Sequence, residues 1–295
     1  MIRMAVTGLQ GQVVTSLIER ARTAGAVEIV ALGRPELDLA DAPSIDRALT
    51  RAGADIIVSA AAYTAVDRAE SEPDLAMAVN GAAPGLIAAT AARLAVPVIH
   101  LSTDYVFDGA KAEPYWEEDA VNPLGAYGRS KLAGEQAVQQ ATADYAILRT
   151  AWVYSPFGAN FVKTMLRLAA DRDAINVVAD QQGSPTNALD IADAVIAVAR
   201  QMLDHPGDPD KRGVFHLSGT GYTDWASFAE AIVTASAARG GPEVHVNRIT
   251  TSEYPTAAPR PANSRLNTEK LGRHFGIAMP DWRTSLSPVV QRLLA

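Results

Sequence analysis

Three residues in the middle of the chain have side chains and a spacing suited to acid–base chemistry. Thr103 lies in the segment STDYVF (102–107), and Tyr127 and Lys131 lie in YGRSK (127–131). Tyr127 and Lys131 are four residues apart, so on a helix they share one face. An ammonium group beside a phenol stabilises the phenolate and lowers the tyrosine pKa, as a general acid near neutral pH requires. Thr103 adds a hydroxyl that can orient a carbonyl oxygen.

Alternating strands and helices must bring these side chains together. Short apolar segments predict strands at 2–8, 27–33, 54–62, 96–103, 144–154 and 213–219. Between them the sequence predicts helices up to about residue 24 and at about 42–53, 74–94 and 127–141. Near-continuous apolar strands separated by helices are typical of a parallel sheet covered on both faces. We therefore expect a doubly wound Rossmann sheet, whose strand ends face the ligand crevice.

The alternation loosens after Tyr154, which predicts a smaller, partly discontinuous C-terminal α/β lobe that binds the substrate. Helices are expected at 160–173, 190–203 and 223–240, with Thr223 and Asp224 as candidate N-caps. The Pro- and Asn-rich segment 254–267 is expected to be a loop. The predicted dinucleotide-binding domain comprises 1–154 and about 174–219, and the second lobe comprises about 155–173 and 220–295.

The first strand runs into TGLQGQVV (7–14), which resembles a dinucleotide-binding turn. Gly8 permits the tight turn, and Gly11 lets the backbone approach a pyrophosphate at the helix N-terminus. Val14 stands where such fingerprints have a third glycine, whose main task is close helix–strand packing. A tight strand–helix turn without a ligand would give the same two glycines. The position of this loop after the first strand favours the cofactor interpretation.

The end of the second predicted strand indicates which dinucleotide is bound. NAD-binding units usually place Asp or Glu there, whereas this chain has Gly33 and Arg34. A guanidinium suits a 2′-phosphate, so NADPH is the expected cofactor and NADH stays open as a second one. The alternative is an ordinary surface arginine. Asp38 and the adjacent Leu39 are candidates for the adenine side.

Composition excludes several other classes of function. The net charge of −7 argues against a nucleic-acid-binding surface, and the absence of cysteine excludes disulfides and zinc–thiolate sites. Five histidines are scattered without a metal-binding pair. The segment 75–92 is uncharged but interrupted by Gly and Pro, which favours a packed helix over a membrane span. Because the chain begins almost at once with a strand, we expect no secretory signal and a cytoplasmic location.

Taken together, these motifs resemble the extended short-chain dehydrogenase/reductases, and within them the dTDP-4-dehydrorhamnose reductase family. The resemblance implies NAD(P)H-dependent reduction of the C4 keto group of dTDP-4-dehydro-6-deoxy-L-mannose to dTDP-L-rhamnose. It spans nearly the whole chain, through the segments GLQGQV, SAAAYTAVDRAESEP, STDYVFDG, NPLGAYGRSKLAGE, LRTAWVY, NFVKTML, DQQGSPT and RPANSRLNTEKL.

The resemblance also implies roles for individual residues. Tyr127 would donate a proton, while Lys131 would hold the nicotinamide ribose and Thr103 would contact the sugar. The residues expected at the cofactor are Gly8, Gly11, Gln12, Val13, Arg34, Asp38, Leu39, Ala62, Tyr63, Thr64, Tyr127 and Lys131. Those expected at the sugar nucleotide are Thr103, Asp104, Trp152, Asn160, Arg260 and Arg265.

Other functions on the same scaffold remain as alternatives. A nucleotide-sugar 4,6-dehydratase needs an acid/base pair directly after the threonine, but here Tyr105 follows Asp104. Another nucleotide-sugar reductase or epimerase, or a regulatory NADP-binding subunit resembling the methionine adenosyltransferase beta subunit, stays open. Some family members dimerise through a magnesium site built from glutamates. The final segment VVQRLLA contains none, so we expect no metal and either a monomer or a homodimer.

Overall fold

A parallel six-stranded sheet forms the centre of the computed structural model, which describes all residues 1–295. Its strand order is β10-β5-β4-β3-β1-β2, and every neighbouring pair is parallel. The strands are β1 (Ile2–Thr7), β2 (Val27–Leu32), β3 (Ile56–Ser59), β4 (Val98–Thr103), β5 (Tyr145–Thr150) and β10 (Gly213–His216). The predicted doubly wound sheet is thereby confirmed. It includes the sixth strand, β10, which was predicted far along the chain at 213–219.

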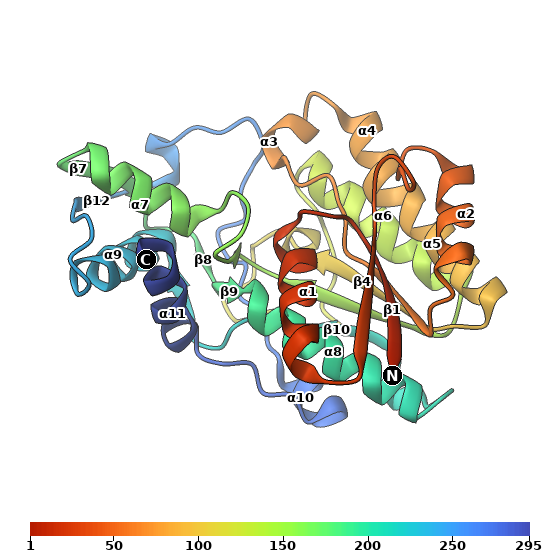
Figure 1. The fold of residues 1–295 in the computed structure, drawn as a ribbon. Coiled ribbons are helices and arrows are strands. Elements are labelled where there is room, and N and C mark those ends of the chain that lie inside the picture. The colour runs from red at the N-terminus through yellow and green to blue at the C-terminus, as the bar shows by residue number, and fades with distance from the viewer.

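Helices cover both faces of this sheet (Figure 1). On one face lie α1 (Gln12–Ala24) and α8 (Ala188–Asp204), packed on alternate strand residues such as Met4 and Val6. On the other lie α2 (Ala42–Ala52), α5 (Ala83–Leu94) and α6 (Ala126–Ala141), packed on the intervening residues such as Ala5. The two-residue period of a strand explains why both sets are apolar.

The long helix expected at 74–94 contains a local widening. It runs as α4 (Pro73–Met77), a π-helical turn η1 (Ala78–Ala82) and α5. Buried Asn80 lies in the π turn, where its side chain bonds both backbone groups of Tyr63 and the hydroxyl of Ser130. Such turns are frequent at functional sites. The whole helix Pro73–Leu94 is long and apolar enough for a membrane span, but half of its apolar window is buried, as in a core helix.

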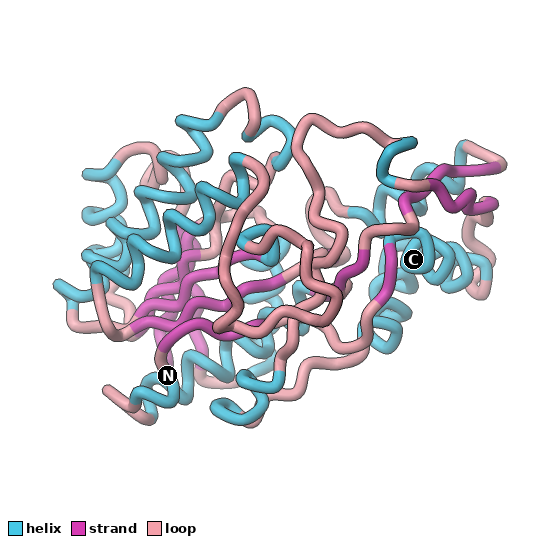
Figure 2. Tube along the Cα trace, turned by 180° about the vertical axis from the view of Figure 1, so that it is seen from behind, coloured by secondary structure: helices cyan, strands magenta, loops and turns pink.

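A smaller lobe lies beyond the carboxyl ends of the strands (Figures 1 and 2). Its core is formed by α7 (Phe161–Asp171), α9 (Trp225–Ala237) and α11 (Trp282–Leu294) around the parallel pair β7 (Ala174–Val178) and β12 (His245–Ile249). The Rossmann domain was expected to resume at about residue 174. Because β7 begins at that position and pairs with β12 of the small lobe, the chain returns to the Rossmann domain only after β7. Neither β12 nor α11 was predicted from the sequence.

Short elements complete the lobe and its connections. Asp224 caps α9 by accepting a hydrogen bond from the Ser227 backbone, whereas Thr223 does not cap it. The remaining helices and strands are α3 (Val66–Ala69), β6 (Val153–Tyr154), β8 (Gln182–Gly183), β9 (Thr186–Asn187), β11 (Thr223–Asp224) and α10 (Glu269–Phe275). Three-residue helical turns lie at η2 (Asp104–Val106), η3 (Pro209–Lys211) and η4 (Thr251–Glu253).

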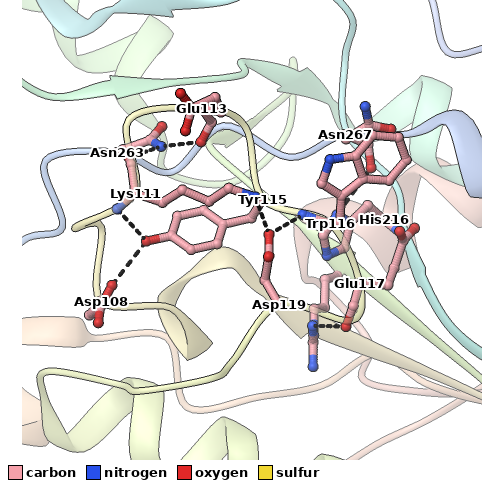
Figure 3. Close-up of polar contacts among 11 residues, drawn as sticks. Asp108, Lys111, Glu113, Tyr115, Trp116, Glu117, Asp119, His216, Asn263 and Asn267 are labelled. Atoms are coloured by element: carbon pink, nitrogen blue, oxygen red, sulfur yellow. Dashed lines mark hydrogen bonds and ion pairs between the residues drawn. The ribbon is translucent and has the colours of Figure 1, made fainter.

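The predicted loop 254–267 returns from the small lobe and is tied to the loop that follows β4. Asn263 donates to the carbonyl oxygens of Lys111 and Glu113 at 2.7 and 2.8 Å. Within the loop that follows β4, the Tyr115 hydroxyl donates to Asp108 at 2.9 Å (Figure 3). These bonds hold the segment that contains Arg260 against the carboxyl end of β4, where the catalytic candidates lie.

Candidate active site

Two of the predicted catalytic residues, Tyr127 and Lys131, line one cavity of about 550 Å³ together with the glycine loop. Tyr127 is the second residue of α6, and Lys131 lies one turn later on the same face. Thr103 ends β4 beside them. The predicted residues that line this cavity are Gly8, Gly11, Gln12, Val13, Ala62, Thr64, Tyr127 and Lys131. The structure therefore brings the acid–base candidates to the loop expected to hold the pyrophosphate.

A close approach between α6 and the end of β4 fixes the position of Tyr127. A Cβ atom on Gly128 would lie 2.3 Å from the carbonyl oxygen of Tyr105, so only glycine fits there. The rings of Tyr105 and Tyr127 then meet edge to face, with centroids 5.5 Å apart. This contact explains why glycine follows the tyrosine in YGRSK.

The electrostatics of Tyr127 differ from the sequence-based expectation. Burial raises the pKa of Tyr127, and the nearby Asp104 carboxyl raises it further. Lys131 does not bond Tyr127; its ammonium donates to the carbonyl oxygen of Leu101 at 2.7 Å and lies 3.4 Å from His100 Nε2. The lowered tyrosine pKa expected from the Tyr–Lys spacing is therefore not seen in this structure, because burial dominates and Lys131 is bonded elsewhere.

Behind Lys131 lies a buried ion pair. Arg149 on β5 donates two hydrogen bonds to Glu135 on α6, at 2.9 and 2.7 Å, and both side chains are at most 5% exposed. Ser102 donates to the same carboxylate at 2.5 Å. Two donors from Arg149 and one from Ser102 compensate the desolvated carboxylate, which would be costly to bury alone. This pair ties α6 to the sheet next to the cavity.

The glycine loop leaves room for an anion. Gly8 has φ +107°, which strains any residue other than glycine, and nothing lies within 4 Å of a Cβ placed on Gly11. No side chain caps the N-terminus of α1. The first backbone N–H groups of a helix without a cap need an outside acceptor, and a pyrophosphate is such an acceptor.

A second cavity, of about 730 Å³, adjoins the loop on the side of β2. Its lining includes Arg34, Asp38, Leu39, Ala62 and Tyr63, as expected for the adenosine half of a dinucleotide. Arg34 is exposed and has no hydrogen bond or ion pair in the protein, so its guanidinium is free to meet a phosphate. Asp38 already accepts a hydrogen bond from the Ala40 backbone.

A third cavity, of about 720 Å³, lies between the lobes and contains Arg260. Arg260 donates to the Tyr105 hydroxyl at 3.1 Å and pairs with Asp67 at 2.7 Å. The aromatic rings of Phe161 and Trp225 form the apolar side of this cavity. A cation beside aromatic walls suits a nucleoside diphosphate, and the contact of Tyr105 with Tyr127 connects this cavity to the catalytic candidates.

Asp104 and Trp152, which were also predicted to bind the substrate, do not line this cavity. Asp104 is buried beside Thr103, whose hydroxyl donates to it at 2.9 Å, and burial raises the pKa of Asp104 to about 6. Trp152 has φ +49° and stacks on Trp225 with centroids 3.5 Å apart, behind the cavity wall. A non-glycine residue in the left-handed region is strained, and such strain clusters at active sites.

Asn160 and Arg265 already bond within the protein. Asn160 caps α7 and donates to the Gln12 side chain at 3.1 Å, linking the glycine loop to the small lobe. Arg265 bonds Asn263 and the carbonyl oxygen of Ala112 and lies over the Tyr222 ring, so it does not line the cavity between the lobes. The binding roles assigned to both residues stay predictions.

Several residues of these cavities were not singled out from the sequence. They are Asp67, Tyr105, Phe161, Gln181, Trp225 and Tyr254. Tyr105 lies inside the STDYVF motif and could have been found from its place next to Asp104. The others come from separate elements, and only the fold brings them together.

A Rossmann sheet with a glycine loop and a Thr–Tyr–Lys cluster at its strand ends defines a nicotinamide-dependent oxidoreductase of the short-chain dehydrogenase/reductase class. The sequence matches the family described as RmlD substrate binding domain over residues 2–295, so the chain belongs to that family.

Individual relatives agree with this assignment. A Sinorhizobium fredii protein named dTDP-4-dehydrorhamnose reductase is 53% identical over 293 residues, covering 99% of this chain and 98% of that protein. The crystal structure of a dTDP-4-dehydrorhamnose reductase from Clostridium acetobutylicum superposes with a TM-score of 0.91 at 34% identity, covering 99% of each chain. A dTDP-4-dehydrorhamnose reductase from Bacillus anthracis in complex with NADP gives 0.89 at 34% identity, covering 98% of each chain.

Proposed function

We propose that the chain reduces the C4 keto group of dTDP-4-dehydro-6-deoxy-L-mannose to give dTDP-L-rhamnose, with NADPH as the reductant. The observation that supports this most is the edge contact between Tyr127 and Tyr105, because Tyr127 lines one cavity and Tyr105 lines the other. One cavity contains Lys131 and the glycine loop, and the other contains Arg260 between aromatic walls. The substrate itself is inferred from the relatives named dTDP-4-dehydrorhamnose reductase.

The residues fit a dinucleotide in three places. The uncapped N-terminus of α1 offers N–H groups to a pyrophosphate, and the open side of Gly11 lets it approach. Arg34, which has no protein partner, would bind the 2′-phosphate of NADPH. Lys131 lines the cavity expected to receive the nicotinamide ribose. When bound, the reduced dinucleotide supplies the hydride that reaches C4 of the sugar.

The chain's own residues would perform the remaining steps. The Thr103 hydroxyl orients the C4 oxygen, and Tyr127 gives its phenolic proton to that oxygen as negative charge develops there. A high phenol pKa keeps Tyr127 protonated and ready to donate before the reaction. Lys131 does not bond Tyr127, so its part is to hold the nicotinamide ribose with the ammonium proton that neither Leu101 nor His100 accepts. Arg260 would hold the diphosphate of the substrate, and the Trp225 ring would bound its apolar part.

The neighbourhood of Thr103 favours reduction over dehydration. Elimination of water requires a second carboxylate next to Asp104, and Tyr105 occupies that position with its hydroxyl bonded to Arg260. A regulatory NADP-binding role would not require Thr103, Tyr127 and Lys131 to converge. A cytoplasmic location and a monomer or homodimer remain part of the proposal, without any nucleic-acid or membrane partner.

An assay of NADPH oxidation distinguishes the proposed reductase from the regulatory NADP-binding alternative. The purified chain should oxidise NADPH only when dTDP-4-dehydro-6-deoxy-L-mannose is present, and product analysis should show dTDP-L-rhamnose. The Tyr127→Phe protein serves as the control, because it keeps the cavities and loses only the hydroxyl. Tight NADPH binding with no turnover of this sugar nucleotide would refute the proposed reaction and favour the regulatory alternative.

A further inference from the structure

His100 and Ser102 on β4 both point to the face of the sheet that α6 covers, because alternate strand residues share a face. On α6, Lys131 and Glu135 are one turn apart and meet them. Ser102 bonds Glu135, and the Lys131 ammonium lies 3.4 Å from His100 Nε2. All four side chains are buried. The reaction described above uses Lys131 but gives no task to His100.

The hydrogen-bond partners of His100 determine its protonation. An ammonium group can only donate, so Nε2 must accept from Lys131. The ring proton then lies on Nδ1, which donates to the Ser59 hydroxyl at 3.1 Å. Burial and the neighbouring ammonium both hold the pKa of His100 well below its usual value, so the ring is neutral. Ser59 on β3 thus orients the ring that faces Lys131.

We propose that His100 is a positioning residue for the reaction: its neutral ring accepts a hydrogen bond from Lys131 and holds this lysine charged and aligned beneath Tyr127. The inference rests on the proposed reductase function for its kinetic consequence, whereas the hydrogen bond itself does not depend on it. The carbonyl oxygen of Leu101 accepts a second ammonium proton at 2.7 Å. The ammonium has three protons, so a third is left for a ligand in the cavity.

Lys131 needs an acceptor such as His100 because its ammonium group is buried. Burial lowers the pKa of Lys131 to about 8, and the charge of Glu135 opposes this effect only in part. The groups around Lys131 are His100 from β4, Glu135 and Tyr127 from its own helix, and Arg149 from β5, which is paired with Glu135. An acceptor hydrogen-bonded to the ammonium favours the charged form. Removing it should therefore lower the pKa of Lys131 further.

The pH dependence of kcat tests this role. His100→Leu should shift the basic limb of the profile down by about one pH unit, a tenfold change in the charged fraction of Lys131. His100→Gln, whose amide oxygen can accept, should keep the limb near that of the wild type. The control is His216→Leu, because His216 is also buried with a pKa lowered to about 3, but bonds the carbonyl oxygen of Asn267 and not Lys131.

A purely structural role gives a different result. In that case His100→Leu and His216→Leu would both lower thermal stability and leave the basic limb in place, which would overturn the proposal. If His100→Leu does not fold, the comparison of His100→Gln with the wild type, together with the spectroscopic measurement below, decides the matter.

NMR of protein labelled with ¹⁵N-histidine tests the hydrogen bond without any turnover. Only five histidines contribute, and the resonances missing from His100→Gln identify His100. We expect a neutral ring protonated on Nδ1 from pH 6 to 7, where Lys131 is charged, with a Nε2 resonance that moves in Lys131→Met while those of His216 stay unchanged. A proton on Nε2, or a His100 signal insensitive to Lys131→Met, would disprove the bond. A wild-type protein that shows the bond but does not reduce the sugar nucleotide would refute only the proposed function.

Discussion

Val14 fills the space beside Gly8: its Cγ2 atom lies 3.1 Å from the position that a Cβ on Gly8 would occupy. Its side chain is 2% exposed and belongs to the core between α1, α8 and the sheet, with Met4 and Val6. Val14 therefore packs under the glycine loop and leaves the anion-binding side at Gly11 open. The residue that replaces the third glycine of the fingerprint is a core residue of the helix–sheet contact.

Val14→Gly should destabilise the protein without changing cofactor affinity. Glycine costs about 1 kcal/mol of helix propensity, and the lost burial costs about 1.5–3 kcal/mol more. Thermal unfolding of the ligand-free protein and NADPH titration of the same variant measure the two effects separately. An increase in NADPH affinity above about tenfold would show instead that Val14 obstructs the cofactor.

Tyr127→Phe should reduce kcat by about 100-fold or more, the usual scale for the loss of a general acid. The ring and its edge-to-face contact with Tyr105 remain, so the dissociation constant of NADPH should stay close to that of the wild type. Single-turnover kinetics should be used to ensure that chemistry limits the rate. A variant that keeps more than about a third of wild-type kcat would contradict the assignment of Tyr127 as proton donor.

NADPH should bind more tightly than NADH, and Arg34→Ala should abolish the difference. A charged hydrogen bond to the 2′-phosphate is worth about 1.5–3 kcal/mol, or roughly 10- to 100-fold in affinity. Both dissociation constants should be measured at moderate salt, because screening weakens exposed charges. Arg22→Ala is a matched control, since Arg22 is an exposed arginine outside the cavities. Equal affinities in the wild type would refute the role of Arg34.

The buried carboxyl of Asp104 should make the ligand-free protein less stable at neutral pH. Its pKa is raised from 3.8 to about 6, so the folded state holds this proton more tightly than the unfolded state. The contribution of Asp104 to stability therefore falls as the pH rises from about 4 to 6, and is constant above that range. The full difference corresponds to about 3 kcal/mol.

Asp104→Asn should remove this dependence, since an amide does not titrate. Unfolding free energies of wild type and variant, compared from pH 4 to 8, should diverge above pH 4, with the variant more stable at pH 7. Other carboxyls titrate in both proteins, so only the difference between the two curves reports on Asp104. Parallel curves would mean that Asp104 has an ordinary pKa.

The arrangement of the Rossmann half could be predicted from local sequence. Apolar segments such as 96–103 and the helices between them follow the periods of buried strands and of helices, and these periods depend on residues near one another in the chain. The order of Thr103, Tyr127 and Lys131 along those elements was enough to place them at one edge of the sheet. The same local information offered Thr223 and Asp224 as caps of α9, and the structure shows that Asp224 is the cap.

Contacts between distant segments were decided only by the tertiary structure. The pairing of β7 with β12 joins residues about seventy positions apart, and no local pattern marks β12, whose residues are mostly exposed or half-buried. The hydrogen bond between Asn160 and Gln12 and the meeting of Arg260 with Tyr105 likewise depend on how the lobes pack.

The protonation states of Tyr127 and Lys131 were likewise decided by the tertiary structure and not by local sequence. The four-residue spacing of Tyr127 and Lys131 determined that both side chains share a helix face, but not what surrounds them. Desolvation sets their pKa values, together with Asp104 near Tyr127 and Glu135 near Lys131, and burial is a property of the packed molecule. The sequence by itself thus determined which groups could react and in what order they lie. The folded structure decided their charge, because the medium around each group is built from segments distant in the chain.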